Sequence, residues 1–257
     1  MKKITLFLII AFIVQESVAQ TPTTVAQTTT KTKQYSEQIW LGYLNQGRIS
    51  KKWGFWLDLQ LRTKDNFFDS LSAAMIRPGI TYYASEKLKF TVGYTYNNIF
   101  PADNHSGVSQ PDQRLWQQVQ WNTNYERIRL MQWIRLEERW RRKIENADEL
   151  AEGYNFNFRL RYNFFFQLPI TKKAYEKGSL YFVVNDELMV NFGKQIVYNY
   201  FDQNRLFTGL QYYFNKDNNI QLNYLNVFLQ TSSGNSYKIV NGVRLFYTQT
   251  IDFRKSS

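Results

Sequence analysis

Apolar and polar residues alternate along most of this chain, and the alternation is most regular between residues 154 and 168. The even-numbered positions are Tyr154, Phe156, Phe158, Leu160, Tyr162, Phe164, Phe166 and Leu168, and the odd-numbered positions are polar except for Phe165. A period of two places these two sets on opposite faces of a β-strand. A strand this long, with an aromatic-rich face opposite a face that carries arginines, is typical of a wall between lipid and a polar lumen.

The same alternation predicts eleven strands along the chain. They cover residues 34–47, 53–63, 71–83, 88–99, 113–124, 127–141, 154–168, 179–191, 204–214, 219–230 and 238–253. Short connections (84–87, 125–126 and 215–218) alternate with long ones (100–112, 142–153 and 192–203). Outer-membrane barrels combine short periplasmic turns with longer outside loops, and bacterial single-chain barrels have an even number of strands. We therefore expect an all-β, transmembrane, antiparallel up-and-down β-barrel of about 12 strands, with 10 as the alternative.

The N-terminal residues predict export. Lys2 and Lys3 precede an apolar run over residues 4–14, and small residues follow up to Ala19. This order is typical of a secretory signal peptide, so we expect residues 1–19 to be cleaved. The apolar run is too short for a helical membrane span. The Thr-rich residues 20–33 are predicted to form a tail or linker, and residues 34–257 the barrel.

Composition narrows the choice of partners and stabilising chemistry. The chain has no cysteine, which excludes a disulfide framework in an exported protein. Its formal net charge is +11, but export argues against nucleic acid as the partner. Membrane lipid and lipopolysaccharide are the partners that we expect instead. The mean hydropathy of −0.48 fits a barrel, because half of each strand faces a polar lumen.

Aromatic residues gather beside the connections that we expect to be periplasmic. They include Trp53, Phe55, Trp56, Tyr82, Tyr83, Phe90, Trp121, Tyr125, Phe164, Phe165, Phe166, Tyr212, Tyr213 and Phe214. Rings of this kind favour the headgroup level of a bilayer. The repetition at one end of the strands predicts an interfacial girdle there.

Most of the charged residues within the expected strands fall on the inward-facing parity. The predicted luminal cluster comprises Asp58, Arg62, Arg77, Arg129, Arg135, Glu137, Arg139, Arg159, Arg161, Glu187, Arg205 and Arg244, and Lys89 and Arg141 share its parity. One interpretation is a lining that selects anions in an open pore. The favoured interpretation is an internal salt-bridge network, because side chains fill small barrels. Glu138 and Asp186 fall on the lipid-facing parity, which a rim position or a β-bulge would explain.

The candidates for catalysis are few. The only histidine, His105, lies beside Ser106 in an expected outside loop, with Asp103 as a third member, so a lipid-modifying enzyme is one alternative. Adjacent loop residues rarely present both side chains in a hydrogen-bonded pair, so we favour a protein without enzymatic activity. No nucleotide-binding glycine pattern or zinc-ligand spacing occurs, and neither cofactor nor metal is expected. A soluble lipocalin-type barrel would need an apolar interior, which the inward arginines oppose.

Several short motifs support a family resemblance. They are Trp40–Leu41–Gly42, Ser50–Lys51–Lys52–Trp53–Gly54, residues 57–62 (LDLQLR), 135–139 (RLEER), Asn185–Asp186–Glu187 and residues 204–210 (NRLFTGL). In this order they resemble a family of outer-membrane β-barrels from Bacteroidetes and related bacteria, catalogued as domain of unknown function 2490. The resemblance covers most of the chain after residue 34. It implies an outer-membrane barrel of a Gram-negative bacterium, with no established activity and no catalytic residues to carry over. We therefore expect a porin-like barrel with a structural or small-solute role.

Overall fold

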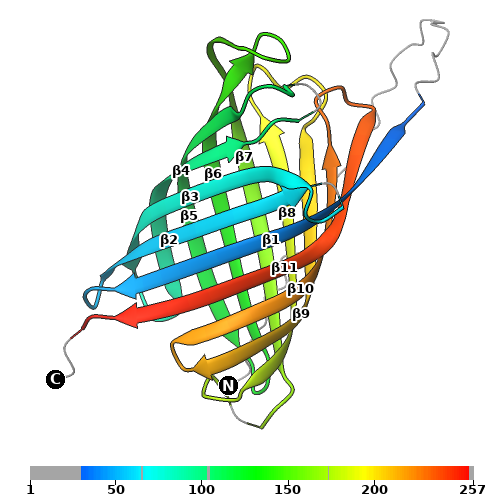
Figure 1. Ribbon diagram of the computed structural model, residues 1–257. Helices are drawn as coiled ribbons and strands as arrows, with labels where there is room; N and C mark the ends of the chain where they lie inside the picture. Colours follow the sequence, from blue (N-terminus) through cyan, green and yellow to red (C-terminus); the bar gives the residue numbers. More distant parts are fainter. Residues whose placement is uncertain (1–29, 65, 103–104, 173, 255–257) are drawn as a thin grey trace, which may run out of the picture. The chain divides into compact units, whose positions relative to one another are not determined.

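Eleven β-strands make up the described part of the chain. The computed structural model describes residues 30–64, 66–102, 105–172 and 174–254, so the expected signal peptide and most of the expected tail lie outside the described residues. The strands are β1 (Thr32–Arg48), β2 (Trp53–Lys64), β3 (Ser70–Tyr83), β4 (Leu88–Ile99), β5 (Gln110–Asn124), β6 (Arg129–Ile144), β7 (Leu150–Pro169), β8 (Leu180–Phe192), β9 (Phe201–Asn215), β10 (Asn218–Gln230) and β11 (Ser236–Asp252) (Figure 1). Within these residues no helix is long and apolar enough to cross a bilayer.

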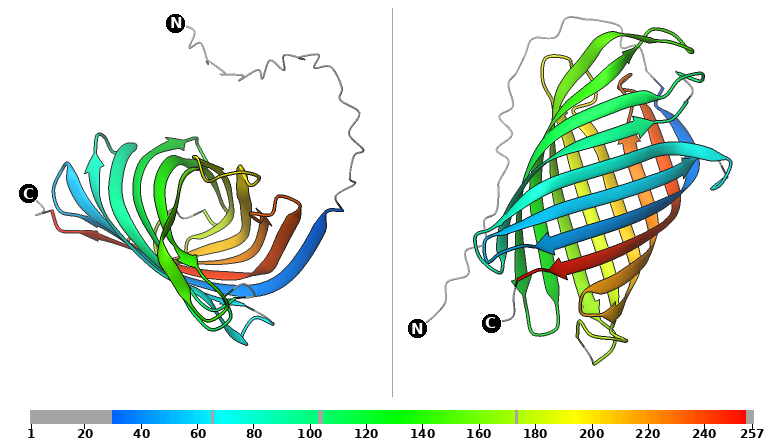
Figure 2. Two further views of the ribbon diagram at one scale, coloured as in Figure 1. Left: turned by 90° about the horizontal axis from the view of Figure 1, so that it is seen from above. Right: turned by 60° about the vertical axis from the view of Figure 1, so that its left-hand side comes forward.

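The strands close into a barrel in sequence order, with one parallel pair (Figures 1 and 2). Consecutive strands are antiparallel, whereas β1 and β11 pair in parallel from Thr32↔Ser236 to Arg48↔Asp252. The expectation of 12 strands, or of 10, is therefore wrong, as is that of a wholly antiparallel wall. All eleven strands predicted from the alternation are present, with ends shifted by a few residues. An odd number makes the first and last strands run in the same direction, so closure requires a parallel pair.

The seam between β1 and β11 brings the two backbones close together. A Cβ atom at Gly242 would lie 1.8 Å from the Gln38 carbonyl oxygen, and one at Gly42 would lie 2.1 Å from the Phe246 ring. Parallel pairing is slightly less stable per residue than antiparallel pairing. The parallel pairing of β1 with β11 is long and unbroken, since it extends over the whole of β1, and this length offsets the weaker pairing of each residue.

The two ends of the barrel differ. We call the end with connections 49–52, 84–87, 125–128, 170–179 and 216–217 the short-turn end, and the opposite end, with 65–69, 100–109, 145–149, 193–200 and 231–235, the loop end. The expected long loop at 142–153 is mostly strand, because the pairs Arg142↔Tyr154 and Ile144↔Leu150 extend the β6–β7 ladder. This hairpin rises beyond its neighbours at the loop end (Figure 2).

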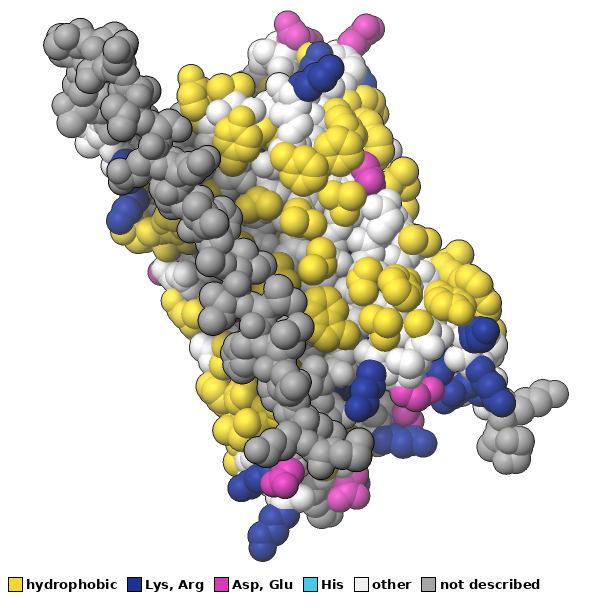
Figure 3. Space-filling model, turned by 180° about the vertical axis from the view of Figure 1, so that it is seen from behind, with side chains coloured by type: hydrophobic (Ala, Val, Ile, Leu, Met, Phe, Trp, Pro, Cys, Tyr) yellow, Lys and Arg dark blue, Asp and Glu magenta, His cyan; other side chains and the backbone are white. Residues whose placement is uncertain are grey.

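The outer surface is apolar between charged ends. Figure 3 shows hydrophobic side chains across the middle of one face, with Lys, Arg, Asp and Glu gathered at its two ends. Mid-strand leucines such as Leu160 and Leu206 are exposed, and aromatic rings such as Trp53 and Tyr125 are exposed at the short-turn end. Three rings assigned to the girdle from the sequence, Trp56, Phe165 and Tyr213, are instead buried inside the barrel.

The two acids that the sequence placed on the lipid-facing parity each pair with an amide on the next strand. Glu138 accepts a hydrogen bond from the Gln117 side chain at 3.2 Å. Asp186 accepts one from the Asn204 side chain at 2.8 Å. The strand register is unbroken at both acids, so a β-bulge does not explain their parity. A shared hydrogen bond lowers the cost of holding these carboxylates on an apolar surface.

The parallel seam is testable by cross-linking, because the chain has no native cysteine. Leu41 and Leu245 are register partners with exposed side chains, so a Leu41→Cys/Leu245→Cys variant should form an intramolecular disulfide under mild oxidation. Gel mobility with and without reductant measures it. The control, Leu41→Cys/Val243→Cys, is displaced by two residues and should cross-link poorly. Efficient cross-linking of the control alone would show a different register.

Candidate functional site

The inward faces of the strands bring charged side chains together inside the barrel. We define the interior charge cluster as the twelve residues predicted from the sequence together with Lys89, Asp112, Arg114, Arg141 and Asp202. Nine of the twelve are buried, and Arg62, Arg129 and Arg244 are half-buried where they line an internal cavity. The period of two explains this placement, because every second side chain of a barrel strand points inward.

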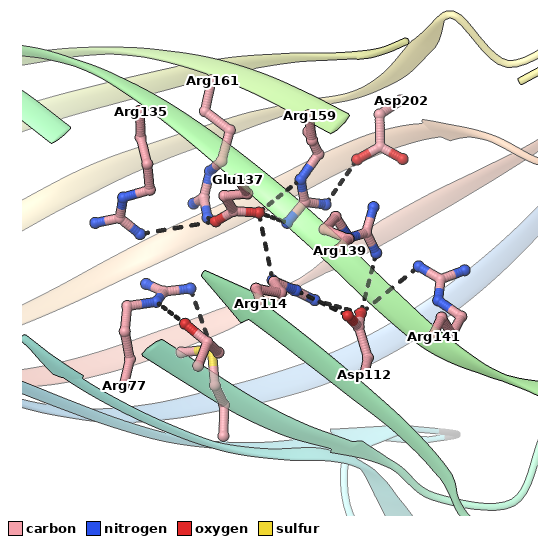
Figure 4. Close-up of polar contacts among 12 residues, drawn as sticks. Arg77, Asp112, Arg114, Arg135, Glu137, Arg139, Arg141, Arg159, Arg161 and Asp202 are labelled. Atoms are coloured by element: carbon pink, nitrogen blue, oxygen red, sulfur yellow. Dashed lines mark hydrogen bonds and ion pairs between the residues drawn. The ribbon is translucent and has the colours of Figure 1, made fainter. Parts of the chain in front are cut away.

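Glu137 is the centre of the cluster (Figure 4). Its carboxylate is fully buried and lies 2.5 Å from Arg159 Nη2 and 2.5 Å from Arg161 Nη1. Arg114 and Arg135 approach the same carboxylate at 3.7 and 3.9 Å. One acid on β6 therefore joins arginines from β5, β6 and β7, which are neighbouring strands of the barrel wall.

Asp112 forms a second centre nearer the loop end. Its Oδ2 atom lies 2.6 Å from Arg114 Nη2, 3.0 Å from Arg139 Nη2 and 3.7 Å from Arg141 Nη2. Asp202 continues the network through Arg159 at 2.8 Å. Figure 4 shows the two centres linked through Arg114, which contacts both acids.

Two further acids complete the cluster. Asp58 pairs with Arg77 at 2.8 Å. Glu187 pairs closely with Arg161, and its other oxygen lies 3.8 Å from Arg205. Each of the five carboxylates of the cluster therefore lies within ion-pair distance of at least one arginine.

The sequence missed Asp112, Arg114 and Asp202 as members of the cluster. The expected strands began at 113 and 204, whereas β5 begins at Gln110 and β9 at Phe201. Asp112 and Asp202 were therefore assigned to loops. The parity of Asp112, Arg114 and Gln118 was the available signal, but Pro111 and Gln113 between them are not convincingly apolar.

Cations outnumber acids in the cluster. Of its members twelve are Arg or Lys and five are Asp or Glu. Among the described residues, four of these cations have no carboxylate within ion-pair distance: Arg62, Lys89, Arg129 and Arg244. Aromatic rings face these four instead, and the cluster keeps a surplus of positive charge.

A cavity of about 460 Å³ extends inward from the short-turn end. Exposed residues such as Glu86 and Lys87 form its rim, and it reaches as far as Arg135 and Arg161. Glu137 and Asp112, with their partners Arg114, Arg139 and Arg159, do not line it. The two central acids of the ionic network therefore lie outside the cavity lining.

Aromatic rings hold the arginines of the inner cavity. The Arg62 and Arg205 guanidinium groups lie 3.8 and 5.1 Å from the centre of the Trp40 ring. Phe207 packs beside Trp40, with ring centres 5.9 Å apart, and Arg244 lies 4.5 Å from the Phe207 ring. Cations and rings therefore alternate from β2 through β1 and β9 to β11, an arrangement that cation–π attraction stabilises.

An ion pair crosses the rim of the cavity. Arg48 at the end of β1 donates hydrogen bonds to both oxygens of Glu86, at 2.6 and 2.7 Å. Hydrogen bonding from Arg48 lowers the pKa of the exposed Glu86 carboxyl below its usual value. The pair links the first and second short turns of the barrel at its open end.

The His105 and Ser106 side chains are held apart from each other in this structure. The His105 ring is buried, and its Nδ1 atom donates to the Val108 carbonyl oxygen at 2.7 Å, whereas Ser106 is exposed. In the described part of the chain the two side chains share no hydrogen bond, and Asp103 lies outside the described residues. Among the residues that the structure describes, no group of three or more His, Cys, Asp and Glu side chains could hold a metal ion.

The role of Glu137 in holding the network can be tested by an isosteric change. Glu137→Gln should lower the free energy of unfolding by about 3–5 kcal/mol, because it leaves buried arginines without their partner. Glu138→Gln is the matched control, since Glu138 faces outward and bonds only one amide. Denaturant titration of the folded barrel in lipid or detergent compares the two. Equal losses in both variants would contradict the central role of Glu137.

Comparison with known proteins gives a family without an assigned activity. A family model described as Protein of unknown function (DUF2490) matches residues 37–238. Searches of the curated proteins and of the solved structures returned no significant match. The match covers most of the chain, from within β1 to the start of β11, including Glu137 and the arginines around it. The chain belongs to the family described as Protein of unknown function (DUF2490).

Proposed function

We propose that this protein is an outer-membrane β-barrel of a Gram-negative bacterium whose lumen is closed to ion flow by the interior charge cluster. Its role is structural or concerns a small solute, and it has no enzymatic activity. The single observation that carries the proposal is the buried ionic network around Glu137 and Asp112, which spans a barrel with an apolar exterior. The expected signal peptide supplies the route of export.

The exterior supports placement in a bilayer. Aliphatic side chains such as Leu160, Leu206 and Leu222 are exposed in mid-strand, where water would make a broad apolar belt unfavourable. Aromatic rings such as Trp53 and Tyr125 lie near the strand ends. Barrels in outer membranes combine these two features. Membrane lipid, including lipopolysaccharide, is the partner that such a surface fits.

The interior supports a closed lumen. An open pore needs a continuous aqueous path, but several side chains between the cavity and the loop end are almost completely buried. They include Arg139, Arg159, Asp112 and Asp202. Small barrels are filled by side chains, and long paired arginines fill this one. The anion-selective pore, which was the alternative from the sequence, would require this network to open.

Loop lengths set the proposed orientation. The short-turn end faces the periplasm and the loop end faces outward, as in other outer-membrane barrels. The cavity then opens toward the periplasm, and the buried network lies on the outer side of it.

Membrane placement can be tested by arginine substitutions at two depths on one strand face. Leu160 and Leu168 both face outward on β7 and are 39% and 38% exposed, but Leu160 is central and Leu168 lies beside the short-turn end. In a bilayer Leu160→Arg should cost roughly 2–4 kcal/mol and Leu168→Arg roughly 0–1 kcal/mol. Folding into lipid vesicles, followed by heat-modifiable gel migration, measures both. Two equally tolerated substitutions would indicate an aqueous exterior.

The closed lumen can be tested by bilayer conductance. Purified wild-type protein, reconstituted in planar bilayers, should give no discrete channel openings, because the ionic network blocks the path. An open porin reconstituted in the same way provides the positive control, and heat-modifiable migration shows that the sample is folded. Reproducible, anion-selective openings would overturn the closed lumen and favour the pore.

A further inference from the structure

The four cations of the interior charge cluster that have no carboxylate partner among the described residues all lie in one place. Arg62, Lys89, Arg129 and Arg244 each line the cavity that opens at the short-turn end. The cations without cavity contact, such as Arg114 and Arg139, all have a carboxylate close by. Carboxylates therefore neutralise the cluster's cations outside the cavity. The cations that keep an unneutralised charge line the cavity, where a solute can reach them.

Amides occupy the positions where carboxylates would neutralise these cations. Gln60 Oε1 accepts a hydrogen bond from Arg62 at 2.8 Å, and Gln46 Oε1 accepts one from Lys89 at 2.5 Å. Glutamate has nearly the same shape as glutamine and would form an ion pair at either position. The amides orient the cations and leave their charge available to another anion.

Aromatic rings hold the arginines of the inner cavity in position before any ligand binds. Arg62 and Arg205 stack on Trp40, and Arg244 stacks on Phe207. Stacking on a ring occupies the flat face of a guanidinium and leaves its N–H edge to donate. Holding donors in position before binding lowers the entropy cost of binding an anion.

One buried donor also lacks a partner. Arg135 is 1% exposed and lines the cavity, and its Nη1 atom makes no hydrogen bond within the described residues. Its other nitrogens donate to Gln118 at 2.9 and 2.6 Å, and the nearest carboxylate oxygen to Nη1 is 3.9 Å away. A buried unsatisfied donor is costly, which marks a position where an acceptor from a ligand would be favourable.

We propose that this cavity is a binding site for a small, water-soluble phosphate monoester with a flat ring as its body. A phosphate group presents three oxygens in a tetrahedral arrangement and can accept hydrogen bonds from guanidinium groups on several sides, whereas the two oxygens of a carboxylate lie in one plane. The Phe165 ring lines the same cavity and offers a stacking surface to the body. A volume of about 460 Å³ falls within the usual range for small-molecule sites.

The route of entry follows the charge. Lys89 and Arg129 lie closer to the short-turn end than Arg62 and Arg205, so positive potential continues from the mouth inward. Such a gradient raises the local concentration of anions. The inference rests on the proposed function only for the compartment from which the ligand comes, the periplasm.

Binding can be measured on the full chain folded in detergent, with phenyl phosphate as the probe. Titration calorimetry at low salt should show saturable binding that weakens with added salt. Inorganic phosphate should bind more weakly because it lacks the ring, and neutral phenyl glucoside should not bind. No saturable binding of phenyl phosphate at millimolar concentration would overturn the site, as would equal binding of phenyl glucoside.

Two substitutions and one control locate the site. Arg62→Gln and Arg244→Gln should each weaken phenyl phosphate binding by roughly tenfold or more, the usual loss for one charge-assisted hydrogen bond. Arg142→Gln removes the same charge from a strand position outside the cavity, where Arg142 stacks on Tyr154. Unchanged binding in the control supports the site. Equal weakening of phenyl phosphate binding in all three variants would show that only the net charge of the protein matters, which would overturn the site.

If the substituted variants do not fold, a second measurement on the wild-type protein tests the same site. Phenylglyoxal modifies accessible arginines, and mass spectrometry of the fragments identifies them. Phenyl phosphate should protect Arg62 and Arg244 and leave Arg142 reactive. Protection of none of them would overturn the site. Channel openings in the bilayer experiment would overturn the closed lumen alone, because binding in the cavity does not require the network to block ions.

Discussion

The interior of this barrel has too few carboxylates for its cations, and the rest of the structure accommodates that shortage. Two unit charges about 4 Å apart interact by about 4 kcal/mol at an effective dielectric constant of 20, so unshielded arginines in a narrow lumen repel strongly. Glu137 and Asp112 meet the problem by each contacting three or more arginines. The remaining cations turn to aromatic faces and amides, at the end where the cavity admits water. The excess of cations over carboxylates therefore accounts for the shared acids, for the arginines packed on aromatic rings and for the positive charge along the cavity.

The parallel seam has a different origin. Eleven strands in sequence order leave the last strand parallel to the first, and the barrel closes only if these two pair along their length. Glycines at 42 and 242 permit the close approach that this pairing requires. The seam also positions the site, since Trp40 on β1 is the register partner of Arg62 on β2 and of Arg244 on β11. Closure in this register places Trp40 on the strand between those that carry the two free arginines, Arg62 and Arg244.

Much of the fold could be predicted from the alternation alone, because a period of two is a local property of each strand. It located all eleven strands and the inward parity of residues such as Arg135, Arg161 and Glu187. The alternation itself indicated eleven strands. The predicted number was wrong because the general rule that bacterial barrels have an even number of strands was given more weight than this count. Closure is a property of the whole sheet, and no single segment encodes it.

The site was less predictable, because it depends on which cations are left without acids. Asp112 and Asp202 looked like loop residues, so the position of the ionic network could not be derived from the strands alone. Trp56, Phe165 and Tyr213 looked like girdle residues, because an aromatic ring near a turn suits either face of the wall. Once these groups are placed, the distinction between the network and the cavity follows from charge. Arginines near Glu137 and Asp112 are paired with those acids, whereas Arg62 and Arg244 lose hydration inside the barrel without a carboxylate at ion-pair distance among the described residues. A cost of this kind is typical of a functional site, where the compensating partner is a ligand rather than another part of the chain.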